Sequence, residues 1–458
     1  ADAVATLTAK LNGSDDQLRT FKVTVPHIIS DDEKIQSDLD AVNILDADDI
    51  RSNFVVPTVG DNGSAITWSV KNDGGANASI AEGYNENNAK VSVNRPASGK
   101  DSVNVTLEAT ATNNGATANR EFPITVLPMP SDQSKDEAYI WAFFTGEGVG
   151  GEKISLAASK GNNALDWNTL NEGTPLFTST EGEQGLRDPF IMRSHDGDTF
   201  YMLATDLKIS GRKGSFSAAQ YNGSLYIEVW ESNDLVNWTN QRHIKVSDDS
   251  AGNTWAPEAY WDDSLGAYVV FFSSRMYTDD TRSTAVTSTN TGYAYNVLLY
   301  CITRDFKTFT EPVMWQDTNY SRIDSTVIKV GDYYYRFTKN EESGAAGSYI
   351  TNGKSTFLER SKVLTATTEE ASPDTDPETG WQLLDQRILP FEGPEAIKLN
   401  AGDKYQNEAG DAMVIMADSG GYQPYMTSES ALLNCDWNNR LSQTDGWHTQ
   451  KDQNAGVS

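Results

Sequence analysis

A repeat of about 68 residues in the C-terminal two thirds of the chain constrains the fold more than any other feature. Each copy has a proline- or carboxylate-bearing start, an apolar strand, a tight turn and a second aromatic-rich or apolar strand. The copies are RDPFIMRSHDGDTFYMLATD, APEAYWDDSLGAYVVFFSSR, IDSTVIKVGDYYYRFTKN and EGPEAIKLNAGDKYQNEAGDAMVIMAD. Their leading carboxylates lie 70, 66 and 68 residues apart, at Asp188, Glu258, Asp324 and Glu392. A unit of this length, built of several short strands, is typical of one blade of a β-propeller with long loops.

A second, shorter element indicates the number of units. Segments similar to S-x-D-L-x-x-W recur five times, at Asn163–Leu170, Ser232–Thr239, Thr303–Thr310, Lys354–Ser361 and Ser430–Trp437. The composition favours strands and turns, because the chain has 35 Gly, 19 Tyr, 16 Phe and 11 Trp. We therefore predict an all-β fold in which residues 138–458 form a five-bladed β-propeller.

The N-terminal part contains a different repeat, of two similar hairpins. Thr6–Pro26 and Thr106–Pro128 each give a strand, a polar turn and a strand with alternating apolar residues, and they start 100 residues apart. That spacing is about the size of an immunoglobulin-like sandwich. We expect residues 1–27 to end a preceding repeat, residues 28–128 to form an immunoglobulin-like domain that opens with a short helix, and residues 129–137 to be a linker. The pattern W-S…V-x-R-P…V-T-L-x-A-T resembles the atrophied bacterial immunoglobulin-like domains that flank secreted polysaccharide-degrading enzymes.

The charge of the chain argues against several classes of partner. Its 36 basic and 65 acidic residues give a formal net charge of −29, which repels nucleic acids and anionic membrane surfaces. No apolar run approaches the roughly 20 residues that span a bilayer, so we expect no membrane insertion. The two cysteines, Cys301 and Cys435, are too few for a disulfide scaffold and are expected to be buried thiols. A neutral substrate suits such a surface best.

The repeated carboxylates point to a site at the propeller axis. The first strands of all blades line one central channel, so equivalent residues meet at one mouth. Carboxylates gathered there repel one another, so such a cluster indicates a function. Any one of them alone is better explained as the start of a strand, but their phase with the repeat argues against that explanation for the set. Metal binding would justify the cluster, but no D-x-D-x-D-G loop occurs and the four histidines are scattered. Glycoside hydrolysis would also justify it, because inverting enzymes use an acid and a base roughly 6.5–9.5 Å apart, and a third carboxylate can raise the pKa of the acid.

Four motifs, taken together and in order, resemble glycoside hydrolase family 43. They are GLRDPFI with FYMLATD, TWAPEAYWD, RIDSTVI with YYYRFTK, and FEGPEAIK, and the resemblance covers roughly Ala138 to Trp437. The resemblance implies a five-bladed propeller enzyme with an inverting mechanism. It implies that Asp188 is the general base, that Asp324 modulates a pKa and orients its neighbours, and that Glu392 is the general acid. The Gly-Pro that follows Glu392 would then fix the direction of its side chain.

Further residues are expected near the sugar. The resemblance places Trp255 in the sugar subsite, and the other expected substrate-binding residues are Glu258, Arg187 and Tyr425, with Arg275 and Tyr422 as weaker candidates. The chain departs from the family pattern in two places: Ser325 follows Asp324 where proline is frequent, and the late Arg-His-Gly segment is absent, with His448 a poor match. We therefore expect an incomplete last blade. We expect that the chemistry needs no cofactor. The sequence leaves open whether a structural calcium ion binds.

These features predict an inverting exo-glycoside hydrolase that removes α-L-arabinofuranosyl residues from arabinan, arabinoxylan or arabinogalactan. Alternatives that share the chemistry are a β-xylosidase, an endo-arabinanase and an exo-galactanase, because loop-built pocket walls decide the sugar. A non-catalytic glycan-binding propeller is the alternative from another class. We expect a monomeric bacterial protein that is secreted or attached to the cell surface, and a chain that is a piece of a larger protein.

Overall fold

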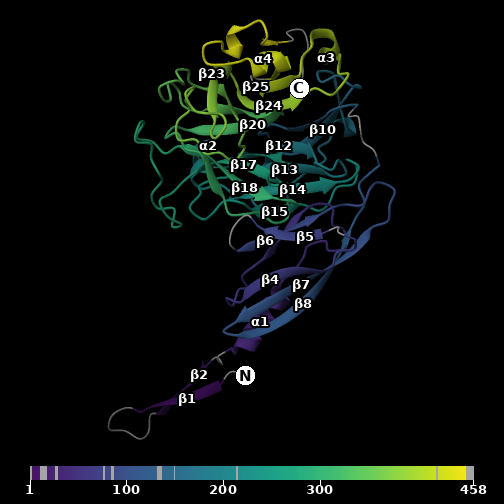
Figure 1. The fold of residues 1–458 in the computed structure, drawn as a ribbon. Helices are drawn as coiled ribbons and strands as arrows, with labels where there is room; N and C mark the ends of the chain where they lie inside the picture. The colour runs from purple at the N-terminus through teal and green to yellow at the C-terminus, as the bar shows by residue number, and fades with distance from the viewer. Residues whose placement is uncertain are drawn as a thin grey trace. The chain divides into compact units, whose positions relative to one another are not determined.

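The computed structural model describes residues 3–10, 18–25, 29–75, 78–83, 87–131, 137–148, 150–212, 215–418 and 421–449 (Figure 1). The chain divides into two compact units, Ala1–Pro128 and Met129–Ser458. Strands dominate both units, so the predicted all-β class is confirmed. Within the described residues, no helix is both long enough and apolar enough to cross a membrane. The first predicted turn, at 11–17, and most of the predicted linker, at 132–136, lie outside the described residues.

The N-terminal unit contains two three-stranded antiparallel sheets around one apolar core. The first consists of β3 (Phe54–Pro57), β6 (Asn88–Val93) and β5 (Ala78–Glu82), and the second of β4 (Ala65–Asn72), β7 (Val103–Asn113) and β8 (Ala116–Val126). Every second residue of β7, from Val105 to Ala111, is fully buried, as expected for strands with one face on the core. A further pair, β1 (Ala3–Lys10) and β2 (Leu18–Val25), forms the predicted first hairpin.

The predicted short helix is α1 (Asp31–Ala41). The Ser30 side chain accepts the Glu33 N–H and the Glu33 carboxylate accepts the Ser30 N–H, which is a capping box. Ile35 and Leu39, one helical turn apart, enter the core of the N-terminal unit. The helix is therefore fixed both by its cap and by one apolar face.

The C-terminal unit contains five antiparallel sheets whose strands follow one another in chain order. The first sheet has β9 (Ile140–Phe144), β10 (Ile154–Ser159) and β11 (Trp167–Thr169). The second has β12 (Leu186–Arg193), β13 (Phe200–Asp206), β14 (Tyr226–Ser232) and β15 (Arg242–Lys245), and the third has β16 (Trp255–Asp262), β17 (Ala267–Arg275), β18 (Asn296–Thr303) and β19 (Val313–Gln316). The fourth has β20 (Arg322–Val330), β21 (Tyr333–Asn340), β22 (Ser355–Ser361) and β23 (Gln382–Leu389), and the fifth has β24 (Glu392–Lys398), β25 (Met413–Asp418), β26 (Tyr422–Thr427) and the short β27 (His448–Thr449).

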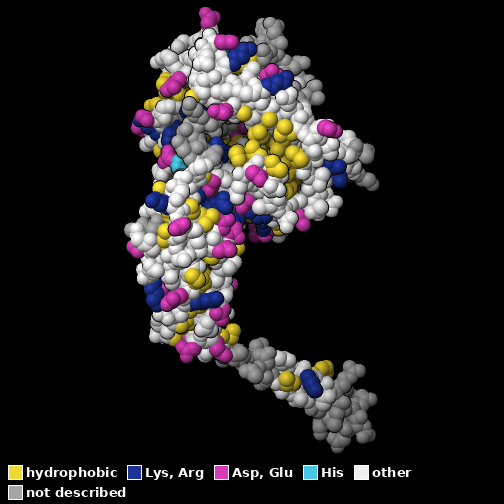
Figure 2. Space-filling view, turned by 90° about the vertical axis from the view of Figure 1, so that its right-hand side faces the viewer, with side chains coloured by type: hydrophobic (Ala, Val, Ile, Leu, Met, Phe, Trp, Pro, Cys, Tyr) yellow, Lys and Arg dark blue, Asp and Glu magenta, His cyan; other side chains and the backbone are white. Residues whose placement is uncertain are grey.

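Short helices connect some of these strands: α2 (Ser215–Tyr221), α3 (Lys404–Ala409) and α4 (Glu429–Leu433), with 3₁₀ turns at Asn171–Gly173 and Leu441–Gln443. In the described residues the last sheet has four strands and the first has three. Both cysteines are buried and free, as predicted. On the face drawn in Figure 2, acidic side chains are spread over both units, and hydrophobic side chains gather in one patch on the C-terminal unit.

Five apolar clusters join the five sheets in sequence. Each cluster takes side chains from two consecutive sheets, and the last joins the fifth sheet to the first. Along β13, Tyr201 and Leu203 pack toward the third sheet, whereas Met202 and Ala204 pack toward the first. This explains the unbroken apolar runs of the second strands, because a strand covered on both faces has no polar side. In the closing cluster, Trp141 of β9 packs with residues of the fifth sheet.

One buried ion pair lies inside the fourth sheet and its junction with the third. The guanidinium of Arg336 donates to Glu359 Oε2 at 2.9 and 2.7 Å. Its carbon lies 4.4 Å from the ring centre of Trp315 and 4.2 Å from that of Trp381. Neither charged side chain has exposed surface.

We expect Arg336→Met to lower the free energy of unfolding by about 3–5 kcal/mol, because it leaves the Glu359 carboxylate buried without its cation. Urea unfolding followed by tryptophan fluorescence measures this loss. Arg242→Met is the control, since Arg242 pairs with Glu231 at 2.8 Å on a partly exposed surface, where such a pair contributes about 0–1 kcal/mol. Equal losses in the two variants would contradict this account of the buried pair.

Candidate active site

Each first strand of the second to fifth sheets carries a β-bulge near its start. The pairing shifts between Arg187 and Phe190, between Trp255 and Glu258, between Ile323 and Ser325, and between Glu392 and Glu395. One residue in each bulge has a positive φ angle: Asp188 (45°), Ala256 (49°), Asp324 (47°) and Gly393 (57°). Successive members of this set lie 68, 68 and 69 residues apart. The repeat is therefore a repeat of backbone geometry, and each bulge redirects one side chain.

This geometry corrects the expectation that the four leading carboxylates occupy equivalent positions. Asp188 and Asp324 are equivalent, because both are the positive-φ residue of their bulge. Glu258 lies two residues after its bulge residue, Ala256, and Glu392 lies one residue before Gly393. The residue equivalent to Glu258 in the fifth sheet is Glu395. The carboxylates therefore did not mark equivalent positions in the four strands. The position of a bulge is set by the backbone pairing, whichever side chain the bulge residue carries.

The bulges surround a pocket whose walls come from all five sheets. It holds about 860 Å³, counted out to its open mouth. Its acidic lining residues are Asp188, Glu258, Asp324 and Glu395. Its aromatic residues include Trp141 of β9 and Tyr422 of β26, whose rings meet edge to face at 5.0 Å. Carboxylates opposite an aromatic wall can hold a sugar ring and act on its acetal bond.

Asp188 is held as a hydrogen-bond acceptor. Thr205 Oγ1 donates to Asp188 Oδ2 at 2.9 Å, and Thr205 Oγ1 in turn accepts the Ala256 N–H at 2.8 Å. Because the backbone N–H already occupies the hydroxyl oxygen, the single hydroxyl proton points to Asp188. Burial raises the pKa of Asp188, the Arg187 guanidinium and the Thr205 hydroxyl lower it, and the charge of Glu392 raises it. The hydrogen bond and the guanidinium favour the ionised form that a base requires.

Asp324 lies close enough to the other two proposed catalytic carboxylates to be affected by their charges. The pKa of Asp324 is raised to about 7, by burial first and also by the charges of Asp188 and Glu392, while the Lys339 ammonium opposes the rise. Asp188, Asp324 and Glu392 therefore form one interacting group. A carboxylate that titrates near neutrality within such a group can set the protonation of its neighbours.

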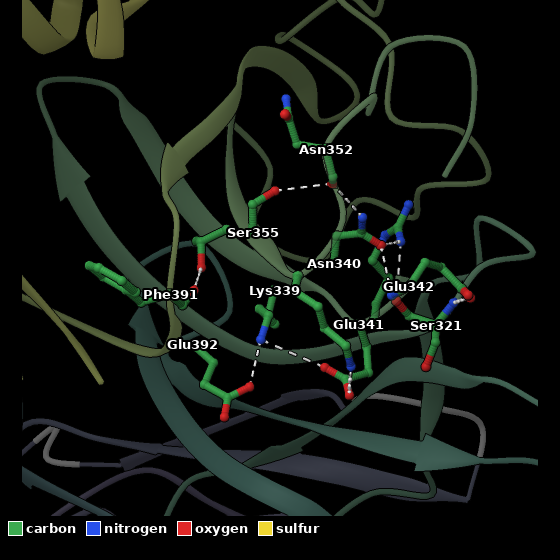
Figure 3. Close-up of polar contacts among 12 residues, drawn as sticks. Ser321, Lys339, Asn340, Glu341, Glu342, Asn352, Ser355, Phe391 and Glu392 are labelled. Carbon is green, nitrogen blue, oxygen red and sulfur yellow. Dashed lines mark hydrogen bonds and ion pairs between the residues drawn. The ribbon is translucent and has the colours of Figure 1, made fainter. Parts of the chain in front are cut away.

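Glu392 is exposed and is directed by a buried lysine (Figure 3). Lys339 Nζ donates to Glu392 Oε2 at 2.7 Å and lies 3.7 Å from Glu341 Oε2. The Lys339 side chain is 2% exposed, whereas that of Glu392 is 59% exposed. Glu392 therefore keeps its second oxygen, Oε1, free of this bond. Glu392 is not among the residues that line the pocket, but its charge acts on Asp188 and Asp324.

Glu258 and Glu395 form a pair of buried carboxyl groups in the same pocket. Burial raises the pKa of both, that of Glu395 to about 8, and the two side chains are hydrogen-bonded to each other. Thr326 also bonds to Glu258, and the Ala396 N–H donates to Thr326 Oγ1 at 3.3 Å. Thr326 lies in β20 of the fourth sheet and Glu258 in β16 of the third, so this bond joins two sheets. A hydrogen bond between two carboxyl groups requires a proton. The Glu258–Glu395 pair therefore shares one proton and is not doubly ionised.

The other sequence candidates are divided between the pocket and its surroundings. Tyr422 lines the pocket, but Tyr425 stacks on Trp447 with ring centres 5.6 Å apart. Trp255 is not a lining residue and meets Phe216 edge to face at 6.4 Å.

The two arginines among the candidates are bound to protein groups. Arg187 lies 3.4 Å from both Glu147 and Glu152, and its guanidinium carbon lies 4.6 Å from the ring centre of Phe144. Arg275 donates to Gln220 and lies over Tyr221. Of these two, Arg187 acts on the site through the pKa of Asp188.

Sequence reasoning missed three residues of the site. Lys339 stood inside a quoted strand motif, and a lysine in an otherwise apolar and aromatic second strand was a signal that it is paired. Thr205 gave no signal, because threonine is ordinary in strands. Glu395 was hidden by the assumption that one carboxylate per repeat faces the axis, although G-P-E and A-P-E share a pattern that would have paired it with Glu258.

Replacing Thr205 tests how Asp188 is held. We expect Thr205→Val to raise the pKa of Asp188, because it removes a hydrogen bond that lowers it. If Asp188 must be ionised to act, the acidic limb of the kcat/KM profile moves to higher pH. Thr338→Val is the control, since the Thr338 hydroxyl bonds to Ser325 at 2.9 Å in the fourth sheet. An unchanged acidic limb in Thr205→Val would contradict the role given to this bond.

Comparison with known families agrees with the two units. The family model described as "Probable glycosyl hydrolase domain", of the glycoside hydrolase family 43-related type, matches residues 135–454. The model described as "Atrophied bacterial Ig domain" matches residues 35–129. Both resemblances seen in the sequence motifs are thereby confirmed.

Individual relatives extend the comparison. The "Alpha-L-arabinofuranosidase" of Bifidobacterium longum subsp. longum is 49% identical over 397 residues, covering 83% of this chain. The chain spans 37% of the length of that relative. The alpha-L-arabinofuranosidase from Lactobacillus brevis has 16% identity and a TM-score of 0.35, with 58% of this chain and 72% of that one covered.

A Cellvibrio cellulosa alpha-L-arabinanase mutant has 15% identity and a TM-score of 0.38, with 64% of this chain and 89% of that one covered. The glycosyl hydrolase model matches more than two thirds of the residues of this chain, which therefore belongs to the glycoside hydrolase family 43-related domains.

Proposed function

We propose that this chain carries the catalytic site of an inverting α-L-arabinofuranosidase that acts from the ends of plant cell-wall polysaccharide side chains. One observation carries the proposal: Asp188 and Asp324 occupy matching bulges around one pocket, and Glu392 immediately precedes a third bulge. The named activity of the Bifidobacterium longum relative supports the choice of sugar.

The five sheets are proposed to form the five blades of a propeller. The support is the closed series of apolar clusters, in which each sheet packs on the next and the fifth packs on the first. Such closure leaves no sheet without two neighbours, and it brings the first strands together around the pocket. The two sheets of the N-terminal unit are likewise proposed to be an immunoglobulin-like sandwich that serves as a spacer, in line with its family match.

The proposed mechanism gives each carboxylate one task. Asp188, fixed as an acceptor by Thr205, takes a proton from the water that attacks the anomeric carbon. Glu392 delivers a proton to the leaving oxygen from Oε1, because Lys339 occupies Oε2. The water adds from the face opposite the leaving group, so the configuration inverts. Asp324, whose own pKa is raised by the charges of Asp188 and Glu392, is assigned the modulating and orienting role.

Exo action is favoured because walls from all five sheets enclose a pocket rather than two sides of an open groove. Trp141 and Tyr422 would pack on the ring of the terminal sugar. A β-xylosidase, an endo-arabinanase and an exo-galactanase would use the same carboxylates and stay alternatives. A non-catalytic glycan-binding propeller is disfavoured by the retention of the proposed base, modulator and acid, since binding alone needs none of them.

The chemistry is proposed to need no cofactor. A structural calcium ion takes about six to eight oxygens, yet no three of the described pocket carboxylates bring ligand atoms within 4.8 Å of one another. The described pocket therefore does not fit calcium without further ligands. We also propose a monomer, because one chain supplies every wall of the pocket, and action outside a bacterial cell, secreted or attached to the surface.

Time-resolved proton NMR of the sugars released from arabinan, arabinoxylan and arabinogalactan tests the proposal. We expect arabinose to appear first as the β-anomer, which then mutarotates. Release of the α-anomer would overturn the inverting mechanism, and release of xylose or galactose would replace the proposed sugar. Binding to the polymers without any release of sugar would favour the glycan-binding alternative.

A further inference from the structure

Three neighbouring strands of the second sheet bring together a group of side chains outside the pocket. Asp206 ends β13, Glu228 lies in β14, and His243 lies in β15 directly opposite Glu228 in the pairing. One ligand atom from each lies within 4.8 Å of the other two, and among the described residues this is the only such group of three His, Cys, Asp or Glu. Asp206 and Glu228 are buried at 1% and 0% exposure. A bound cation would balance the charge of two buried carboxylates and would use the imidazole as a further ligand.

An unpaired oxygen points into this group. Asp206 Oδ1 accepts the Glu183 N–H at 2.8 Å, but Asp206 Oδ2 is buried and accepts no hydrogen bond. A buried acceptor of this kind costs about 1–3 kcal/mol unless something satisfies it. A bound cation would do so.

A glycine keeps the space beside the unpaired oxygen open. Gly182 has a φ of 51°, and a Cβ atom added there would lie 2.0 Å from Asp206 Oδ2 and 2.7 Å from His243 Cε1. Any other residue at this position would fill the space between the carboxylate and the imidazole. The space between Asp206 and His243 is thus open because Gly182 has no side chain.

The ligand side chains are held in place from behind. Gln241 Nε2 donates to Glu228 Oε2 at 2.6 Å, which leaves Glu228 Oε1 facing His243 Nδ1 at 2.6 Å. The His243 ring stacks on Tyr226, with ring centres 4.0 Å apart and planes 3° apart. Such supports fix the direction of metal ligands before the metal arrives.

We propose that Asp206, Glu228 and His243 form a structural site for a divalent cation of the zinc type. An imidazole nitrogen with two carboxylate oxygens suits zinc, whereas calcium prefers oxygen ligands alone. The cation enters between Glu228 and His243, whose direct hydrogen bond opens, and it binds each ligand at about 2.0–2.2 Å. Asp206 adjoins Thr205, and successive strand residues face opposite sides. Because Met202 and Ala204 face the first sheet, Asp206 lies on that face too, and the cation secures the end of β13 there.

The test is a titration of the chelator-treated full chain with Zn²⁺, followed by calorimetry and by the thermal unfolding midpoint. We expect one equivalent of Zn²⁺ to bind and to raise the midpoint, and Ca²⁺ not to compete. His243→Gln and the isosteric Asp206→Asn should each weaken Zn²⁺ binding at least tenfold. Co²⁺ titration should give visible absorption bands of a nitrogen- and oxygen-ligated ion, which disappear in His243→Gln.

His448→Gln is the matched control, because His448 Nε2 lies 3.2 Å from Asp411 but belongs to no group of three such ligands among the described residues. It should bind Zn²⁺ as the wild type does. No binding to the wild type, or equal binding by wild type and His243→Gln, would overturn the proposal. If His243→Gln fails to fold, Asp206→Asn gives the same comparison. None of these outcomes depends on glycosidase activity, so failure here leaves the proposed function standing.

Discussion

Glu392→Gln is expected to lower kcat/KM on natural arabinan roughly 10²- to 10⁴-fold, the usual contribution of a general acid. Glutamine keeps the size of the side chain and can still accept a bond from Lys339 with its amide oxygen. It cannot supply the proton that the leaving oxygen needs. The loss should therefore appear in the chemistry, with the fold and the thermal unfolding midpoint nearly unchanged.

The leaving group separates a lost acid from a lost structure. An aryl arabinofuranoside with an acidic phenol departs without protonation, so Glu392→Gln should retain most of its activity on that substrate. Glu341→Gln is the matched control, because Glu341 also lies beside Lys339 but is not adjacent to a bulge. It should remain active on both substrates. Equal losses on the natural and the aryl substrate in Glu392→Gln would contradict the role of Glu392 as the acid.

The sequence was sufficient to predict several strands, the short helix and the five sheets of the C-terminal unit. The segment AITWSVKN coincides with β4, and the acidic stretch after Ser30 forms α1. Both follow from local rules, period-two alternation and helix capping, which act within a few residues. The second strands were recognisable for the same reason, since two covered faces leave an unbroken apolar run.

The site was predictable only where it lies on the repeat. Asp188 and Asp324 sit at the bulges, and Glu392 lies one residue away from one, so their approximate place followed from the spacing. Which side chain a bulge turns toward the axis depends on one inserted residue, and the sequence pattern does not reveal it. Tyr422 and Tyr425 illustrate this sensitivity: they lie three residues apart on β26, so they face opposite sides, and only Tyr422 lines the pocket. Lys339 and Thr205 come from second strands, whose positions relative to the bulges depend on pairing.

Asp324→Asn is expected to reduce activity roughly 10²-fold or more and at the same time to stabilise the folded protein at alkaline pH. The activity is lost because the proposed mechanism needs the Asp324 carboxylate, whose pKa responds to the charges of Asp188 and Glu392. The stabilisation follows from its environment. Burial and two neighbouring carboxylates disfavour the ionised form of Asp324, and asparagine carries no charge in any pH range.

The sign of the pH dependence follows from the raised pKa. Asp324 has a pKa of about 7 in the folded chain, against about 3.9 in an unfolded one. Its favourable contribution is complete below about pH 4 and is lost as the pH rises through about 7. Wild type and Asp324→Asn should therefore have similar free energies of unfolding at pH 4. At pH 8 the variant should be more stable by about 2–4 kcal/mol, at about 1.4 kcal/mol for each unit of pKa difference.

Urea unfolding of both proteins from pH 4 to pH 8 measures this difference directly. Asp385→Asn is the control, because Asp385 is also a sheltered carboxylate but accepts the Arg387 and Ser442 N–H groups at 3.1 and 2.9 Å. Removing that carboxylate should destabilise the fold, so the same substitution is expected to have opposite signs at the two positions. If Asp324→Asn is no more stable than wild type at pH 8, the ionised form of Asp324 does not lower the free energy of unfolding. In that case the group of three carboxylates would not be coupled, and the place of Asp324 in the proposed mechanism would fall with it.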